Sequence, residues 1–474
     1  MAFGGGRSMR VLIAYCYSLP HVGGLWTYVH ELRQALEKKG HSVAIMGADV
    51  RNQHYYLLGT DQTVRTRSFS SVVKPIVEQY YRKCWPKLDR WILNRETFRY
   101  SFELAAAYFG LEQYDIIHTQ DAESTRAISR VKPANTPLIS TFHCSHTRET
   151  FVAQNKAPGT MRWRYVAVEE ALAVNAADNL IVPSNWLHSI IQSDYHPEKN
   201  HIRVIPHGID AAMLRARMEA PSPLQRKEGI TSIVCVARLV PEKGHCYLLE
   251  ALAELKKVRQ DWVCWLVGDG YLRRTLTEMR DRLGLQEQVV FAGSQENVPS
   301  ILAQADIFVL PSMLETLGYA AMEAQLSGKA VIVTDTGGLR EVVQHMKTGM
   351  VVPTEQSAPL STSLLRLLDD RKLARRLGAN ARRWARKQWP VEKMLGQTMD
   401  VYYNAFDQTK RAADSESEEV VFGNQPIKPF ARLFAKRYAD KVEDVQQWKY
   451  AIASLPDGYA IPDWEIAKRL TADT

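Results

Sequence analysis

The 474-residue sequence contains no apolar run that approaches the roughly 18 residues of a membrane-spanning helix. Its first eight residues, MAFGGGRS, hold no apolar core of the length that a signal peptide needs. The six cysteines include no C-x-x-C pair, and Cys16, Cys235 and Cys264 lie within apolar runs, so we expect reduced, structural thiols. These absences predict a soluble, cytoplasmic chain.

The length and the charge of the chain set further limits. A chain of 474 residues is too long for one ordinary core, so two domains plus appendages are expected. Hydrophobic residues make up 46% and charged residues 24%, as in soluble globular proteins. The formal net charge of +8 leaves nucleic acid, an anionic membrane and an anionic substrate open as partners until the excess charge is located.

Residues 65–100 hold a large share of the excess charge. They contain nine Lys/Arg against three Asp/Glu, interleaved with aromatic side chains. The interleaved aromatic residues include Tyr80, Tyr81, Trp85, Trp91, Phe98 and Tyr100. We expect this basic aromatic insertion to form a first-domain surface that docks a peripheral anionic membrane or an anionic acceptor. The alternative is a helical excursion whose aromatic rings pack in the core and whose cations are solvated.

Two alternations of apolar runs with helical patterns predict two α/β domains. In the first, an apolar run at 10–16 precedes a Gly-Gly turn and a helical pattern at 27–39, and a strand at 42–46 completes a β-α-β unit. A polar, Pro-containing stretch at 221–229 leads into the first strand of the second domain at 232–237. Two such sheets in tandem place a ligand cleft at the carboxyl ends of their strands. Further strands are expected at 115–118, 138–142, 179–182, 263–267, 289–291, 307–310 and 330–333.

These patterns set the domain boundaries. We predict a first domain at 9–220, a second at 225–390, a crossing helix at 391–408, and a linker with a C-terminal extension at 409–474. The acidic stretch at 414–419 favours a flexible linker, and we expect the extension to be a separable module without a catalytic part.

A pair of glutamates separated by seven residues is the most informative chemical signal. Glu315 and Glu323 follow a predicted strand and stand just over two helical turns apart. A helix that begins near Thr316 places Glu315 at its positive N-terminus and Glu323 on nearly the same face. The backbone N–H groups of Thr316, Leu317 and Gly318 are then unpaired donors of the kind that bind phosphate. The alternative is an ordinary solvated helix with a glutamate at its N-terminus.

Two other loops support the phosphate interpretation. The stretch VARLVPEKG at 236–244 places Arg238 and Lys243 on a strand-to-helix loop, where two cations can neutralise a diphosphate leaving group. Gly23 and Gly24 stand on the matching loop of the first domain, where the absence of a Cβ lets the backbone approach a phosphate closely.

With these pieces in order along the chain, the sequence resembles the retaining glycosyltransferases of the GT-B fold that are grouped as family 4. The resemblance covers roughly residues 9–405, except 50–110, and ends near 409. The matching pieces are PHVGGLWTYVHELRQALEKKGHSV (20–43), IIHTQ (116–120), TFH (141–143), VIPHGID (204–210), VARLVPEKG (236–244), LVGDG (266–270), VVFAGS (289–294), ADIFVLPSMLETLGYAAMEAQLSGKAVIVTDTGGLREVV (305–343) and TGMVVP (348–353).

The resemblance implies two Rossmann-like domains that face each other across a cleft, and it assigns roles to residues. Glu315 contacts the donor sugar, and Glu323 holds the ribose hydroxyls of the nucleotide. Arg238 and Lys243 bind the diphosphate, while His143 approaches the transferred sugar from the first domain. The base is held by the segment Gly293, Ser294 and Gln295. Departures from the family pattern at Leu317, Gln325, Leu326 and His207 remove no charged group from this site.

The implied reaction moves a sugar from a nucleotide diphosphate donor, with a UDP-sugar favoured, to a hydroxyl of a sugar, lipid-linked or small-molecule acceptor. The resemblance implies retention of configuration. We expect a front-face substitution, because no further carboxylate has the setting of a nucleophile. No Asp-x-Asp motif follows a strand, so no metal and no cofactor is expected to be obligatory. One alternative is a nucleotide-sugar epimerase of the same fold. The other, a nucleic-acid-binding protein, lacks any recognisable RNA- or DNA-binding motif, so we expect no nucleic-acid partner.

Overall fold

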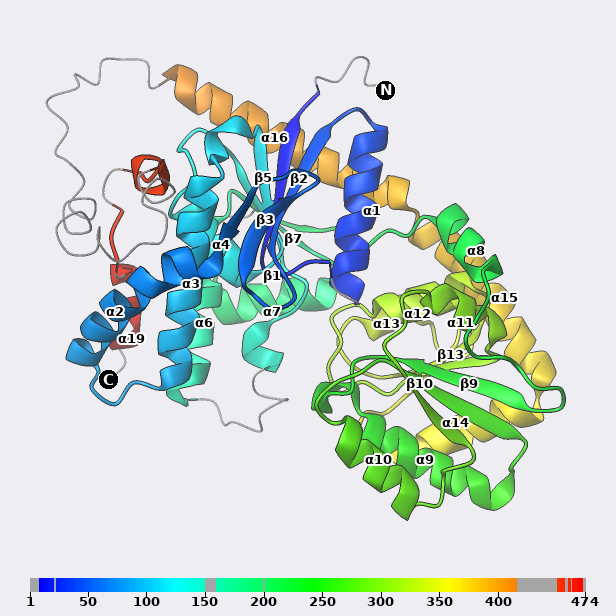
Figure 1. Cartoon of the computed structure of the whole chain (residues 1–474). Helices are drawn as coiled ribbons and strands as arrows, with labels where there is room; N and C mark the ends of the chain where they lie inside the picture. The colour runs from blue at the N-terminus through cyan, green and yellow to red at the C-terminus, as the bar shows by residue number, and fades with distance from the viewer. Residues whose placement is uncertain are drawn as a thin grey trace, which may run out of the picture.

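The computed structural model describes residues 8–20, 23–149, 159–198, 201–415, 450–456, 459–461 and 463–471. Figure 1 shows two α/β domains, each built on its own sheet, with the long helix α16 (Val391–Ser415) lying over the first. The predicted α/β class and the two Rossmann-like domains of a GT-B fold are confirmed. Within the described residues, no helix is both long and apolar enough to cross a membrane.

The first domain contains an eight-stranded sheet in the order β4-β3-β2-β1-β5-β6-β7-β8. All neighbouring pairs from β2 to β8 run parallel, whereas β3 and β4 are antiparallel additions at one edge. The sequence analysis did not predict these two short strands, because they fall in the region that the family resemblance omits. The strands are β1 (Arg10–Ser18), β2 (Ser42–Ala48), β3 (His54–Leu58), β4 (Thr63–Arg65), β5 (Ile116–Thr119), β6 (Leu138–Thr141), β7 (Asn179–Val182) and β8 (Ile202–Val204).

Helices cover both faces of this sheet. In α1, the apolar side chains of Val29, Leu32 and Leu36 are fully buried because their spacing puts them on one face. The helices are α1 (Gly24–Lys38), α2 (Thr66–Cys84), α3 (Arg90–Tyr108), α4 (Ala122–Ser129), α6 (Met161–Ala176), α7 (Asn185–Tyr195) and α8 (Ala211–Glu219), with a 3₁₀ turn at Leu111–Gln113.

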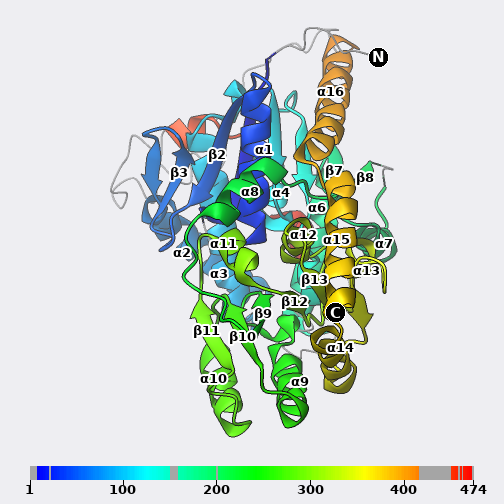
Figure 2. The ribbon, with the colours of Figure 1, turned by 90° about the vertical axis from the view of Figure 1, so that its right-hand side faces the viewer.

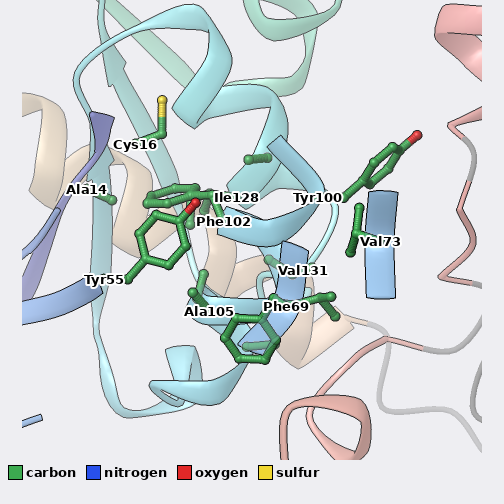
Figure 3. Close-up of a cluster of buried hydrophobic side chains, with 14 of the residues drawn as sticks. Ala14, Cys16, Tyr55, Phe69, Val73, Tyr100, Phe102, Ala105, Ile128 and Val131 are labelled. Carbon is green, nitrogen blue, oxygen red and sulfur yellow. The ribbon is translucent and has the colours of Figure 1, made fainter. Parts of the chain in front are cut away.

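The basic aromatic insertion at 65–100 forms α2 and the first half of α3. Tyr81 and Tyr100 are fully buried in the core of the first domain, and Figure 3 shows Tyr100 among the side chains of that core. Arg99 is fully buried as well and forms ion pairs inside the protein. The aromatic rings are therefore largely core residues, as in the alternative interpretation. Seven of the nine cations are nevertheless exposed, namely Arg65, Arg67, Lys74, Arg82, Lys83, Lys87 and Arg90.

The second domain contains a six-stranded parallel sheet in the order β11-β10-β9-β12-β13-β14. The chain reverses direction across the sheet between β9 and β12, where Rossmann-like sheets bind their ligands. The strands are β9 (Thr231–Val236), β10 (Trp262–Val267), β11 (Val289–Gly293), β12 (Ile307–Leu310), β13 (Ala330–Thr334) and β14 (Met350–Val352). The helices are α9 (His245–Val258), α10 (Arg273–Arg282), α11 (Val298–Gln304), α12 (Tyr319–Leu326), α13 (Leu339–Val342), α14 (Ser357–Asp369) and α15 (Arg371–Gln388), with a 3₁₀ turn at Pro241–Lys243.

A helical arm connects the second domain back to the first. In Figure 2, α15 and α16 follow one another along one side of both domains. The helix α16 extends to Ser415, beyond the predicted end of the crossing helix at 408. It packs against α1, and Tyr402 shares a 2.7 Å hydrogen bond with the buried His118 of β5. This arm ties the C-terminal part of the second domain to the sheet of the first.

The described part of the C-terminal extension packs on the first domain, so the prediction of a separable module is wrong for these residues. Asp463 is buried and its carboxylate accepts hydrogen bonds from Arg126 at 2.6 and 2.9 Å. Tyr459 donates a 2.7 Å hydrogen bond to Glu103 of α3. The helix α19 (Trp464–Thr471) lies against α6. The predicted linker at 414–419 lies outside the described residues except for its first two positions, which end α16.

Candidate active site

A cavity of about 1050 Å³ lies between the two domains, at the carboxyl ends of both sheets. The structure brings twelve of the thirteen predicted site residues to its walls: Gly23, Gly24, His143, Arg238, Lys243, Ser294, Gln295, Glu315, Thr316, Leu317, Gly318 and Glu323. The thirteenth, Gly293, is set back from the wall, where its carbonyl accepts a 2.8 Å hydrogen bond from the backbone N–H of Gly268.

The two predicted diphosphate cations reach the cavity from the loop that follows β9. Lys243 donates a 2.7 Å hydrogen bond to Oε2 of Glu315, and both side chains are largely buried. Arg238 is 60% exposed and pairs with Glu242 at 3.3 Å. An ammonium group has three donors, so the bond to Glu315 leaves two for a ligand. The site thus combines a fixed cation with an accessible one.

The loop that carries Glu315 is pressed between two other loops. A Cβ on Gly244 would lie 2.1 Å from the carbonyl oxygen of Pro311, and a Cβ on Gly337 would lie 1.9 Å from the carbonyl oxygen of Glu315. Both glycines also have positive φ angles. The N–H of Gly338 donates a 3.0 Å hydrogen bond to the carbonyl of Glu315. Because no larger residue fits, these glycines fix the position of the Glu315 backbone.

The helix after this loop begins later than predicted. The sequence analysis placed its start near Thr316, but α12 starts at Tyr319 with Gly318 as its N-cap at φ 91°. A glycine in the left-handed region interrupts the helical backbone and so sets the boundary. The free backbone donors at the helix start are therefore those of Tyr319 and Ala320, because the N–H groups of Ala321 and Met322 bond to Gly318. Glu315 lies on the preceding loop.

Two helix N-termini meet at the cavity. The first turn of α1 follows Gly23, and the first turn of α12 follows Gly318. A Cβ on Gly24 would lie only 3.3 Å from Cβ of Tyr319, so the two turns are in close contact across the domain boundary. Each helix start presents unpaired N–H groups and a positive end of the helix dipole. Together with Arg238 and Lys243, they make this part of the cavity suited to an anion.

His143 stands at the end of β6, on the first-domain wall. Its Nε2 lies 3.0 Å from Oε1 of Gln120, and its Nδ1 lies 3.4 Å from Nε2 of His207. The ring of Tyr28 packs edge-on against it, with 4.8 Å between the ring centroids. Burial, and then the neighbouring histidines, hold the pKa of His143 well below its ordinary value. Its imidazole is therefore a neutral, firmly positioned hydrogen-bonding group.

Glu323 lies deep in the cavity beside a carboxylate of the first domain. Burial raises its pKa to about 7; nearby Arg217 opposes this shift and Glu31 adds to it. Burial likewise raises the pKa of Glu31 in α1 to about 7. A carboxyl group of the first domain thus contributes to the raised pKa of Glu323 in the second.

Several residues of the cavity wall were missed by the sequence analysis. They are Tyr15, Trp26, Thr27, His30, Asp121, Arg217 and Tyr319. Gln120 and His207 also line the cavity, and both lie within motifs that carried the resemblance. Trp26, Thr27, His30 and Tyr319 lie within such motifs as well. Tyr15, Asp121 and Arg217 lie outside them, and the folding of distant segments brings these three to the wall.

Comparison with known proteins places the chain in a family. The family model described as Glycosyltransferase Family 4 matches residues 22–212, and the one described as Glycosyl transferases group 1 matches residues 217–384. The two models together cover both domains. The chain belongs to the glycosyl transferases group 1 family, with the GT-B fold.

Individual relatives are distant. The chain is similar to the GDP-mannose-dependent alpha-(1-6)-phosphatidylinositol monomannoside mannosyltransferase of Mycobacterium tuberculosis, with 29% identity over 48% of this chain and 62% of that protein, less than two thirds of its length. The fold of the present chain is similar to that of sucrose-phosphate synthase from Thermosynechococcus elongatus, with a TM-score of 0.63 and 22% identity over 85% of this chain and all of the other. It is also similar to that of Anabaena HepE in complex with UDP-glucose, with a TM-score of 0.59 and 19% identity over 84% of this chain and all of the other.

Proposed function

We propose that this protein is a retaining glycosyltransferase that moves a hexose from a nucleotide diphosphate to a hydroxyl acceptor. The observation that carries the proposal is the convergence of two cations, two helix N-termini and two glutamates on one interdomain cavity. A nucleotide sugar presents groups that match each of them, namely a diphosphate, a sugar and a ribose. Family membership supports the same chemistry.

In the proposed reaction, the bond between the anomeric carbon and the diphosphate oxygen breaks as the acceptor oxygen attacks from the same face. The hydroxyl proton of the acceptor passes to the departing phosphate oxygen, so the charges balance. Arg238, Lys243 and the start of α12 stabilise the negative charge that develops on the diphosphate. Neutral His143 and the carboxylate of Glu315 hold the sugar, and closure of the domains excludes water. No group on the wall is assigned as a covalent nucleophile.

The donor base is open to two alternatives. The sequence analysis favoured a UDP-sugar, and the similarity to HepE in complex with UDP-glucose supports that preference. The more similar mannosyltransferase is GDP-mannose-dependent by name. Thermal unfolding in the presence of UDP, GDP, ADP and dTDP separates these alternatives, because a ligand present at 100 times its Kd stabilises the folded state by about 2.7 kcal/mol.

Product analysis then tests the reaction itself. With the donor identified, a transferase releases the nucleoside diphosphate, and NMR of the new glycoside should show the anomeric configuration of the donor. Conversion of the donor into a second nucleotide sugar without any acceptor would replace the proposal with an epimerase. An inverted product would exclude the front-face mechanism.

We also propose that the exposed cations of α2 and of the turn before α3 dock an anionic membrane surface. The segment from Arg65 to Arg90 carries the seven exposed cations named above, and Tyr80 and Trp85 within it are only partly buried. Clusters of Lys and Arg with interfacial aromatic rings suit anionic headgroups. If these cations bind a soluble anionic acceptor instead, the protein should bind that acceptor and should not bind anionic vesicles.

A further inference from the structure

Three potential metal ligands gather on the first-domain wall of the cavity, directly after His143. Among the described residues, the sulfur of Cys144, a ring nitrogen of His146 and a carboxylate oxygen of Glu149 all lie within 4.8 Å of one another. All three residues are partly buried and all three line the cavity. The proposed transfer reaction gives none of them a role.

The backbone beneath this cluster is held in place by a buried carboxylate. Glu170 of α6 is fully buried and accepts hydrogen bonds from the backbone N–H groups of His146 at 2.6 Å and Thr147 at 3.1 Å. The same carboxylate also accepts hydrogen bonds from the hydroxyl groups of Thr147 and Tyr195. The N–H of Glu149 closes a helical turn onto the carbonyl of Ser145 at 2.9 Å. The ligand-bearing turn is thus fixed before any ion binds.

From this arrangement we propose that Cys144, His146 and Glu149 bind a divalent transition-metal ion, with Zn²⁺ as the best match. A thiolate, an imidazole and a carboxylate are the three ligand types that zinc takes in proteins, and soft sulfur disfavours Mg²⁺ and Ca²⁺. Three protein ligands are the number found in zinc sites that keep an open position.

The geometry is compatible with tetrahedral zinc. Bond lengths of about 2.0–2.3 Å put neighbouring ligand atoms about 3.5 Å apart in a tetrahedron. The observed separations of at most 4.8 Å therefore have to close by about 1 Å, which rotation of the His146 and Glu149 side chains supplies. Binding displaces the thiol proton of Cys144 to solvent, so that the thiolate ligates the ion.

The ion would have a distinct place in the site. The cluster is on the wall of the first domain, whereas the diphosphate cations Arg238 and Lys243 come from the second. Its fourth position faces the cavity, where water or a hydroxyl of an acceptor can bind. This inference goes beyond the proposed transfer reaction and does not depend on it, because that reaction assigns no role to Cys144, His146 or Glu149.

Metal binding by the full chain tests the proposal. After dialysis against a chelator, we expect the protein to bind one Zn²⁺ per chain in competition with a chromophoric chelator. Co²⁺ should give a thiolate-to-cobalt charge-transfer band. Cys144→Ser should abolish the band and weaken zinc binding by more than tenfold, while the control Cys246→Ser, a partly buried thiol in α9, should leave both unchanged.

The remaining ligands make the test decisive even if Cys144→Ser does not fold. His146→Asn and Glu149→Gln should each lower zinc affinity by at least tenfold, with unchanged melting curves in the absence of metal. A zinc affinity that stays at the wild-type value in both variants, or a wild-type chain that binds no zinc, would overturn the proposal. Neither readout involves glycosyl transfer, so its outcome is separate from that of the proposed function.

Discussion

Two arginines, one in each domain, use their charge in opposite ways. In the second domain, Arg238 is 60% exposed toward the cavity and has one carboxylate partner, Glu242. In the first, Arg99 is fully buried, with Glu96, Glu103 and Asp463 around its guanidinium. A buried charge with several partners completes a structural network, whereas an exposed charge with one partner remains available to a ligand. Burial and the number of ion-pair partners, and not residue type, distinguish the structural role of Arg99 from the proposed ligand-binding role of Arg238.

The largest expected effect is the loss of Arg99. Arg99→Ala leaves Glu96, Glu103 and Asp463 buried without their shared cation, which should lower the free energy of unfolding by about 3–5 kcal/mol. Urea denaturation followed by circular dichroism measures it. The control is Arg90→Ala at the start of the same helix, where the side chain is exposed and a change within about 0.5 kcal/mol is expected. Equal effects of the two substitutions would contradict the distinction between the two kinds of arginine.

The next effect is on turnover. Arg238→Ala should lower kcat for donor turnover about a hundredfold, because charge on the diphosphate develops only in the transition state. Glu323→Ala removes hydrogen bonds to a ribose that does not change during reaction, so it should chiefly raise the donor KM. Arg274→Ala, whose side chain is 91% exposed on α10, is the matched control. A normal kcat in Arg238→Ala together with an inactive Glu323→Ala would reverse the roles assigned to these residues.

The same contrast explains what could be predicted from the sequence. The second domain was predicted almost strand for strand, because most of its strands are continuous apolar runs, and several of its site residues follow a strand within a few positions. Arg238 and Glu315 stand on loops that directly follow strands, so the sequence around each residue is enough to predict its position. The start of α12 was misplaced because Gly318 adopts a positive φ, which residue spacing alone does not reveal.

The first domain was less predictable because contacts over long sequence distances build it. Arg126 and Asp463 bond to each other although 337 positions separate them. The basic aromatic insertion was expected to be a surface, yet the burial of Tyr81, Tyr100 and Arg99 depends on neighbouring helices and on the C-terminal extension. No local pattern distinguishes a buried arginine from an exposed one.

The sequence analysis also overlooked a second basic helix, α15, which carries eight Lys/Arg and no acidic residue.

Glu323 provides a pH test of the interdomain carboxyl pair. Its pKa is raised to about 7 in the folded protein, so the folded state holds the proton more tightly than the unfolded state. This contribution to stability is complete below the unfolded pKa near 4.5 and is lost as the pH rises through 7, at about 1 kcal/mol per pH unit.

Glu323→Gln should therefore flatten the dependence of unfolding free energy on pH between 5 and 7. Urea melts at several pH values measure the slope, and Glu278→Gln, with a side chain that is 65% exposed, should keep the wild-type slope. An unchanged slope in Glu323→Gln would show that this carboxyl group is ionised throughout the range.

The smallest expected effect concerns the exposed cations of the first domain, because one surface charge contributes little by itself. One Lys near an anionic bilayer contributes about 1 kcal/mol, so Lys83→Ala should weaken sedimentation with phosphatidylserine vesicles about fivefold at low salt. The effect should shrink as salt is added, because the Debye length falls to about 8 Å at physiological ionic strength. Lys387→Ala on α15 distinguishes the two basic surfaces, since it removes one exposed cation from the other domain. If Lys387→Ala weakens binding and Lys83→Ala does not, the membrane-facing surface belongs to α15 and the proposal for α2 is wrong. If both variants bind as the wild type does, neither basic face docks a membrane, and the exposed cations of α2 are merely solvated, as in the alternative interpretation of the insertion.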